Sequence, residues 1–268
     1  MITSDFHMHS AFSLDSESAP EEMIRASIDK ELKTICFTDH YDKDYFYPEG
    51  EAVIDGAEYF AVMAELREQY QSEIDIRIGI ELGLQPHLGS YYKEFINASP
   101  FDFVIGSTHV VRKHDLYERV LFEEYTDGEA YGIVLDEILK NIKAISDFDV
   151  LGHLDYMTRY GNHQARDYSY EIYRDKIDEI FKYLISRGKG VELNMSGFKY
   201  GLGFCHPHPD ALKRYKELGG EIITVGADGH CPEHIAYDFH RVEGILSRAG
   251  FKYYTEFKGR KPIFKQVS

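Results

Sequence analysis

The chain has 268 residues, of which 43% are hydrophobic, and a formal net charge of −16 at pH 7. This length suits one large α/β barrel, so we expect a single domain over residues 1–268. So acidic a surface repels phosphate polymers, and we expect no nucleic-acid partner that binds through basic patches. Because no apolar run approaches the ~18 residues of a membrane span, we expect no membrane partner. The sequence indicates no oligomeric state.

The number and spacing of the cysteines indicate the cellular compartment. Cys36, Cys205 and Cys231 are widely spaced and odd in number. This argues against a disulfide framework or a thiolate zinc site and favours a reducing cytoplasm. The first residues, "MITSDF", show no basic region followed by an apolar one, so no secretory signal is expected. We therefore expect a cytoplasmic protein.

Short aliphatic runs alternate with helical patterns along the chain. We expect strands at residues 2–9, 34–40, 75–83, 101–109, 149–155, 190–196 and 222–230. Apolar residues at helical spacing predict helices at roughly 20–32, 56–72, 86–97, 129–145, 170–187, 209–218 and 238–249. Pro20 suits a first helical turn, and Gly219 with Gly220 suits a helix end.

Strands that alternate with helices predict parallel βαβ units and therefore the α/β class. We expect a seven-stranded, distorted (β/α)7 barrel, although the pattern alone does not separate seven units from eight. The last stretch, "FKYYTEFKGRKPIFKQ", predicts an extra hairpin or an edge strand.

Side chains of the types that bind metals stand where the expected strands end. In a parallel barrel the C-terminal strand ends meet at one face, where active sites lie. His7 and His9 are two residues apart on a strand, so they point to the same side, and Asp228 and His230 repeat this spacing. Imidazole and carboxylate ligands without thiolate suit Zn, Fe or Mn. The nine candidate ligands are His7, His9, Asp15, His40, Glu81, His109, His153, Asp228 and His230.

Nine ligands exceed the four of one tetrahedral site, so we predict two to three divalent ions. Taken singly, these residues have ordinary alternatives. His153 could be a hydrogen-bonded structural histidine, and Glu81 could pair with a lysine. Ligand-type residues at all seven strand ends favour the metal interpretation. We interpret His206 and His208, in "CHPHPD", as residues of a loop and a helix start.

The motifs "DFHMHSAFSLDS", "TDH", "IELG", "STH", "LGHLD" and "GADGH", in this order, resemble the polymerase-and-histidinol-phosphatase (PHP) superfamily over nearly the whole chain. The stretch from "VELNMSGFKYG" to "GADGHCPEHI" resembles its histidinol-phosphatase branch more narrowly. The resemblance implies a distorted (β/α)7 barrel, three divalent ions, and hydrolysis of L-histidinol phosphate in histidine biosynthesis. The implied sites are His7, His9 and Asp228 for the first ion, His109 and His153 for the second, Asp15, His40 and His230 for the third, and Glu81 as a bridge between the first two.

A cationic cluster inside an acidic protein suits a small phosphate monoester as substrate. We expect Asp228 to accept the proton of the attacking water. Arg159 and Lys199 are expected to hold the phosphate, with a surface ion pair as the alternative for Arg159. Lys199 stands where the branch typically has an arginine, and it cannot make a bidentate fork to phosphate. Asn194 is expected either to donate to the substrate or to cap the next segment.

An acidic rim of the substrate pocket would attract the cationic amine of histidinol phosphate. Candidates for this rim are Asp42, Asp44 and Glu192. Two other functions are consistent with the motifs. One is a PHP-type phosphoesterase that acts on nucleotides or nucleic-acid 3′ ends, which the acidic charge disfavours. The other is a non-catalytic metal-binding PHP module, which the complete ligand set disfavours.

Overall fold

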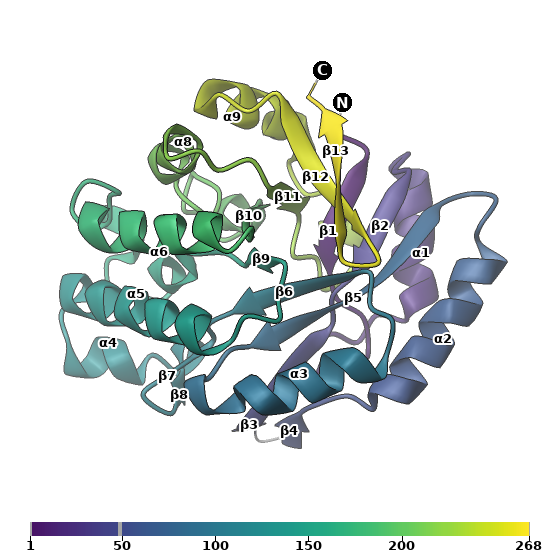
Figure 1. Cartoon of the computed structure of the whole chain (residues 1–268), viewed down its shortest axis with the longest axis horizontal. Coiled ribbons are helices and arrows are strands. Elements are labelled where there is room, and N and C mark those ends of the chain that lie inside the picture. The colour runs from purple at the N-terminus through teal and green to yellow at the C-terminus, as the bar shows by residue number, and fades with distance from the viewer. Residues whose placement is uncertain (1, 48–49, 268) are drawn as a thin grey trace.

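The computed structural model describes residues 2–47 and 50–267, and parallel strands at its centre form a curved sheet (Figure 1). All seven stretches expected as strands contain one. In their order across the sheet, the strands are β1 (Ser4–Met8), β2 (Thr34–Phe37), β5 (Asp75–Gly83), β6 (Phe103–Ser107), β9 (Val150–Leu151), β10 (Gly190–Asn194) and β11 (Ile223–Gly226).

The two edges of this sheet, β1 and β11, meet just beyond β11. The Asp228 N–H donates to the His7 carbonyl and the His9 N–H donates to the Gly229 carbonyl, each at 2.8 Å. Met8 and Gly229 form a parallel bridge. Seven strands thus form a nearly closed barrel, and the predicted distorted (β/α)7 barrel is confirmed. Its C-terminal strand ends lie at one face.

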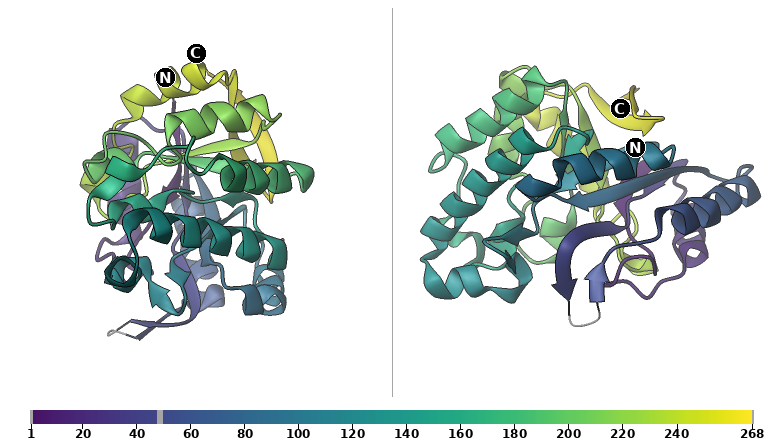
Figure 2. Two further views of the ribbon diagram at one scale, coloured as in Figure 1. Left: turned by 90° about the vertical axis from the view of Figure 1, so that its left-hand side faces the viewer. Right: turned by 60° about the horizontal axis from the view of Figure 1, so that its bottom comes forward.

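Helices surround the sheet (Figures 1 and 2), and each predicted helix is present. They are α1 (Pro20–Asp29), α2 (Gly56–Gln69), α3 (Gly89–Ala98), α5 (Asp127–Ala144), α6 (Arg174–Ser186), α8 (Pro209–Glu217) and α9 (Val242–Ala249). Local chemistry sets their ends: Pro20 opens α1, and Thr126 and Glu129 form a capping box for α5. Gly219, at φ +96°, follows α8 in a conformation that favours glycine. Along the described part of the chain, no helix combines the length and apolar character needed to cross a bilayer.

The expected strand at residues 34–40 is divided in the structure. β2 ends at Phe37, and His40 begins a new strand, β3 (His40–Tyr47), which was not predicted. β3 pairs in parallel with β5, with His40 opposite Glu81, and then in antiparallel fashion with β4 (Gly50–Ala52). The two strands form an arm that projects from the barrel (Figure 2). The short elements β7 (Val110–Val111), β8 (His114–Asp115), α4 (Val120–Glu124) and α7 (Ser196–Lys199) were also not predicted.

The C-terminal stretch forms an antiparallel hairpin of β12 (Tyr253–Lys258) and β13 (Lys261–Gln266), as predicted. Phe257 packs against Phe103, with ring centroids 5.0 Å apart. The Gly259 N–H donates to Asp102 at 2.9 Å, and Asp102 directly precedes β6. The hairpin therefore covers strand ends opposite those that carry the candidate ligands. The prediction of one domain over residues 1–268 includes residues outside the described ones and stays a prediction.

Candidate active site

The nine side chains expected to bind metal converge where the barrel strands end, and Glu81 of β5 stands at their centre. Its Oε2 lies 3.1 Å from His7 Nε2 and 3.1 Å from His40 Nδ1. Its Oε1 lies 2.9 Å from His153 Nε2 and 3.4 Å from His109 Nε2. One carboxylate thus faces rings from four parts of the barrel.

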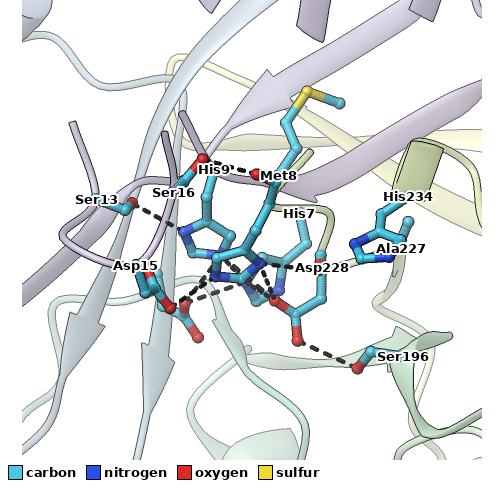
Figure 3. Close-up of polar contacts among 12 residues, drawn as sticks. His7, Met8, His9, Ser13, Asp15, Ser16, Ser196, Ala227, Asp228 and His234 are labelled. Atoms are coloured by element: carbon cyan, nitrogen blue, oxygen red, sulfur yellow. Dashed lines mark hydrogen bonds and ion pairs between the residues drawn. The ribbon is translucent and has the colours of Figure 1, made fainter. Parts of the chain in front are cut away.

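Two further carboxylates complete the cluster (Figure 3). Asp228 Oδ1 lies 3.4 Å from His9 Nε2 and 3.7 Å from His7 Nε2. Asp15 Oδ2 lies 3.0 Å from His230 Nε2 at the solvent side, where the Asp15 side chain is 57% exposed. The structure thus brings together residues that span positions 7 to 230 of the sequence.

The donor set fits divalent ions. Sets of three ligand atoms lie within 4.8 Å of one another, among them His7, His9 and Glu81; Glu81, His109 and His153; and His9, His40 and His230. The buried atoms His40 Nδ1 and His230 Nε2 have no hydrogen-bond partner among the described residues. A carboxylate oxygen lies 3.1 Å from the first and 3.0 Å from the second, in geometry unsuited to a hydrogen bond. A divalent cation placed between such ring nitrogens and carboxylates would be coordinated by both.

Electrostatics hold two of these groups, Glu81 and His9, in forms that can bind a cation. Burial raises the pKa of Glu81, but His7, His40 and His109 more than offset this and hold that pKa well below its usual range. Burial lowers the pKa of His9, and the neighbouring rings of His230 and His40 lower it further. An ionised carboxylate and a neutral imidazole are the ligand forms that metal binding requires. At His7, His40 and His109, burial lowers the pKa but the facing carboxylates more than offset this and raise it, so a metal ion that binds these rings would displace their protons.

A second layer of side chains orients the histidine rings. Glu192 Oε1 lies 2.5 Å from His7 Nδ1, and Asp42 Oδ1 lies 2.8 Å from His109 Nδ1. Holding Nδ1 in this way turns the Nε2 atoms toward the cluster. The expected role of Asp42 and Glu192 at an acidic rim is therefore wrong, since both are buried, at 2% and 1% exposed, and hold rings. Asp44 is exposed and pairs with His87, and its rim role stays a prediction.

Glycine makes one of these close approaches possible. A Cβ at Gly226, the last residue of β11, would lie 2.3 Å from His7 Cβ and 2.6 Å from Glu192 Oε1. Any larger residue would push this pair apart. The short distance between ring and carboxylate thus depends on the neighbouring strand.

Comparison with known proteins agrees with this geometry. Residues 5–196 match the PHP domain family. The chain belongs to the PHP domain family. A histidinol-phosphatase from Lactococcus lactis is 31% identical over 258 residues, which cover 96% of this chain and 95% of that protein. The crystal structure of the histidinol phosphate phosphatase from that organism, complexed with zinc, L-histidinol and phosphate, matches with a TM-score of 0.89 and 31% identity, covering 97% of this chain and 98% of the other. A putative histidinol phosphatase from Listeria monocytogenes, at 18% identity, shares the fold with a TM-score of 0.77 over 88% of this chain and 98% of the other.

Two cations of this PHP chain reach the same aspartate. Arg159, just after β9, donates to Asp228 Oδ2 at 3.3 Å, and its guanidinium lies against the rings of Tyr156 and Tyr200, at 4.7 and 4.3 Å. Its side chain is only 7% exposed, so the alternative of a surface ion pair is wrong. Lys199, at the end of α7, donates to the Asp228 carbonyl at 2.8 Å. Both cations therefore stand beside the cluster of candidate ligands of this PHP barrel.

Asn194, at the end of β10, supports its surroundings. Its Oδ1 accepts from the Ser196 N–H at 3.0 Å, at the first residue of α7, whose N-cap is Met195. Its amide donates to Glu192 at 3.1 Å and to Asp228 at 3.3 Å. A substrate contact by Asn194 would require one of these bonds to break, and it stays a prediction.

One buried residue of the PHP site was not expected there. His208 caps α8, as predicted, by accepting from the Asp210 N–H. His206 is fully buried, and its Nδ1 lies 2.6 Å from Asp155 Oδ1. His206 thus lies in the loop before α8, as predicted, but its burial against Asp155 was not expected. No local pattern marks this pair, because its members are 51 residues apart.

Proposed function

We propose that this chain is a metal-dependent histidinol-phosphatase that hydrolyses L-histidinol phosphate to L-histidinol and phosphate, a step of histidine biosynthesis. The observation that carries this is the convergence of nine ligand-type side chains on one barrel face, with Arg159 and Lys199 beside them. The match over 96% of the chain to a protein named histidinol-phosphatase supports the substrate. Its setting would be the reducing cytoplasm, which agrees with three free cysteines.

Two to three divalent ions would complete this site. Zinc is favoured because the similar Lactococcus lactis structure holds it, and iron or manganese also suit these donors. When bound, such ions take up the charge of the phosphate and lower the pKa of a water molecule, which makes it nucleophilic at neutral pH. The residues proposed to hold them are His7, His9 and Asp228 for the first, His109 and His153 for the second, Asp15, His40 and His230 for the third, and Glu81 between the first two.

Asp228 is the proposed proton acceptor. Burial raises the pKa of its carboxyl, but His7, His9 and Arg159 more than offset this, so the carboxylate stays ionised. Its Oδ1 faces the rings, and its Oδ2 faces Arg159 and Ser196. One carboxylate thus links the ligand cluster to the proposed phosphate-binding cations. Asp228 adopts φ +55°, a conformation that is uncommon for a residue other than glycine and recurs at functional sites.

Arg159 and Lys199 would bind the phosphate of the monoester. The Tyr156 and Tyr200 rings restrict the Arg159 guanidinium, so little further ordering is needed when the anion binds. Both cations offset the negative field of a chain with net charge −16. A small anion can therefore be attracted to this point.

A comparison of substrates tests the proposal. The quantity to compare is kcat/KM for L-histidinol phosphate, nucleoside monophosphates and p-nitrophenyl phosphate. We expect L-histidinol phosphate to lead by at least tenfold, which corresponds to about 1.4 kcal/mol of discrimination. Glu81→Gln supplies the background rate, because it removes the central charge at nearly constant shape. A smaller lead would support the general phosphoesterase, and rates equal to this background would support the non-catalytic module.

A further inference from the structure

Asp155 and His206 form a buried pair behind the proposed phosphate-binding arginine. Both side chains are 0% exposed. Asp155 Oδ2 accepts from the His208 N–H at 2.7 Å, and its Oδ1 lies 2.6 Å from His206 Nδ1. Because both carboxylate oxygens accept, the Nδ1 atom carries a proton and donates it to Asp155. The Nε2 atom of a neutral ring is then an acceptor.

That acceptor faces Arg159. The Nε–H of Arg159 donates to His206 Nε2 at 3.3 Å. A terminal nitrogen of the same guanidinium donates to Asp228 and to the Ser196 hydroxyl. His206 thus holds the Nε side of the guanidinium group, while one terminal nitrogen, Nη2, points toward Asp228 of the ligand cluster.

We propose that His206 is a positioning residue: Asp155 fixes its tautomer, and His206 in turn fixes the orientation in which Arg159 meets the phosphate. This rests on the proposed function, in which Arg159 binds the substrate phosphate. Burial lowers the pKa of His206, in agreement with a neutral ring. Among the described residues, no three-ligand set includes His206 or Asp155, so the pair stands outside the metal cluster.

The chemistry of the pair predicts the effects of three near-isosteric changes. His206→Asn keeps a donor to Asp155 but removes the acceptor for Arg159. His206→Gln restores an oxygen near the Nε2 position. Asp155→Asn can keep its oxygen on the His208 N–H only by turning its NH2 toward His206, which moves the ring proton to Nε2. Two N–H groups, those of His206 and Arg159, would then face each other.

The test measures kcat, KM and inhibition by inorganic phosphate for the metal-loaded enzyme and these variants. In His206→Asn and Asp155→Asn we expect kcat/KM to fall roughly 10- to 100-fold, because small misplacements of a binding group have effects of this size. The inhibition constant for phosphate should rise in parallel, and His206→Gln should recover part of both losses. Metal content and the unfolding midpoint of each variant serve as controls.

The Arg159→Ala background separates positioning from general structural support. There, His206→Asn should lower kcat/KM by less than about twofold further, since the two residues act as one unit. The proposal is overturned if the loss is as large without Arg159 as with it, or if folded, metal-loaded His206→Asn keeps wild-type kinetics. If His206→Asn does not fold, Asp155→Asn and His206→Gln decide by the same criteria. Inhibition by phosphate can be measured with p-nitrophenyl phosphate as the substrate. This test of His206 therefore remains valid even if L-histidinol phosphate is not the preferred substrate.

Discussion

Glu192→Gln is expected to weaken metal binding roughly 10- to 100-fold, the usual effect of losing a partner that orients a ligand. Glu192 Oε1 accepts from His7 Nδ1, and Oε2 accepts from the His153 N–H at 3.0 Å and from the Asn194 amide at 3.1 Å. A glutamine side chain has only one oxygen, so it can accept either from His7 or from the His153 N–H and the Asn194 amide, but not from both. If its NH2 faces His7, the ring proton moves to Nε2, the atom directed at Glu81. If its NH2 instead takes the place of Oε2, it faces the His153 N–H and the Asn194 amide, which are both donors.

In free energy, this loss corresponds to about 1.4–2.7 kcal/mol. Competition of wild type and variant against a chromophoric chelator measures it. Glu179→Gln is the matched control, because Glu179 is 57% exposed and pairs with Lys143 at the surface. An unchanged metal affinity in a folded Glu192→Gln variant would refute the orienting role of Glu192.

Three further changes test other parts of the account. Lys199→Arg should keep or lower KM for the phosphate monoester, because a guanidinium can make a bidentate fork; a severalfold higher KM in steady-state kinetics would count against it. Phe257→Ala should lower the free energy of unfolding by about 3–5 kcal/mol, as expected for a buried aromatic residue; a near-wild-type urea midpoint would show that the hairpin contributes little. Asp178→Asn should be destabilising at neutral pH, because its hydrogen bonds with Arg214 lower the pKa of Asp178. That stabilisation is present above the unfolded-state pKa of about 3.9 and is lost as the pH falls through the folded-state pKa, so a difference in urea midpoint that persists well below pH 4 would contradict it.

The barrel could be predicted because its strands are buried on both faces. Such strands are continuous apolar runs, as in "FVIG" of β6, and the helices between them keep one apolar side. The β3–β4 arm escaped prediction because "HYDKDYFY" consists of charged and aromatic residues and contains no aliphatic run. His40 was placed at the end of a strand but begins one, opposite Glu81. It still enters the cluster, because both positions lie at the same barrel face.

The candidate ligands could be predicted from their place at the strand ends, whereas their supporting residues could not. The partners of Glu192, Asp42 and His206 are His7, His109 and Asp155, which lie 185, 67 and 51 residues away in the sequence. Hydrogen bonds over such separations depend on how strands neighbour one another, and no local spacing encodes this. Glu192 and Asp42 were therefore taken for exposed rim residues, although each is buried against a ring.

Metal titration tests the central claim most directly. Chelated protein is titrated with Zn²⁺ while turnover of L-histidinol phosphate is followed. The nine converging side chains predict that activity returns fully only when two to three ions are bound per chain. Full turnover with one ion or fewer, or turnover that survives complete chelation, would contradict the account.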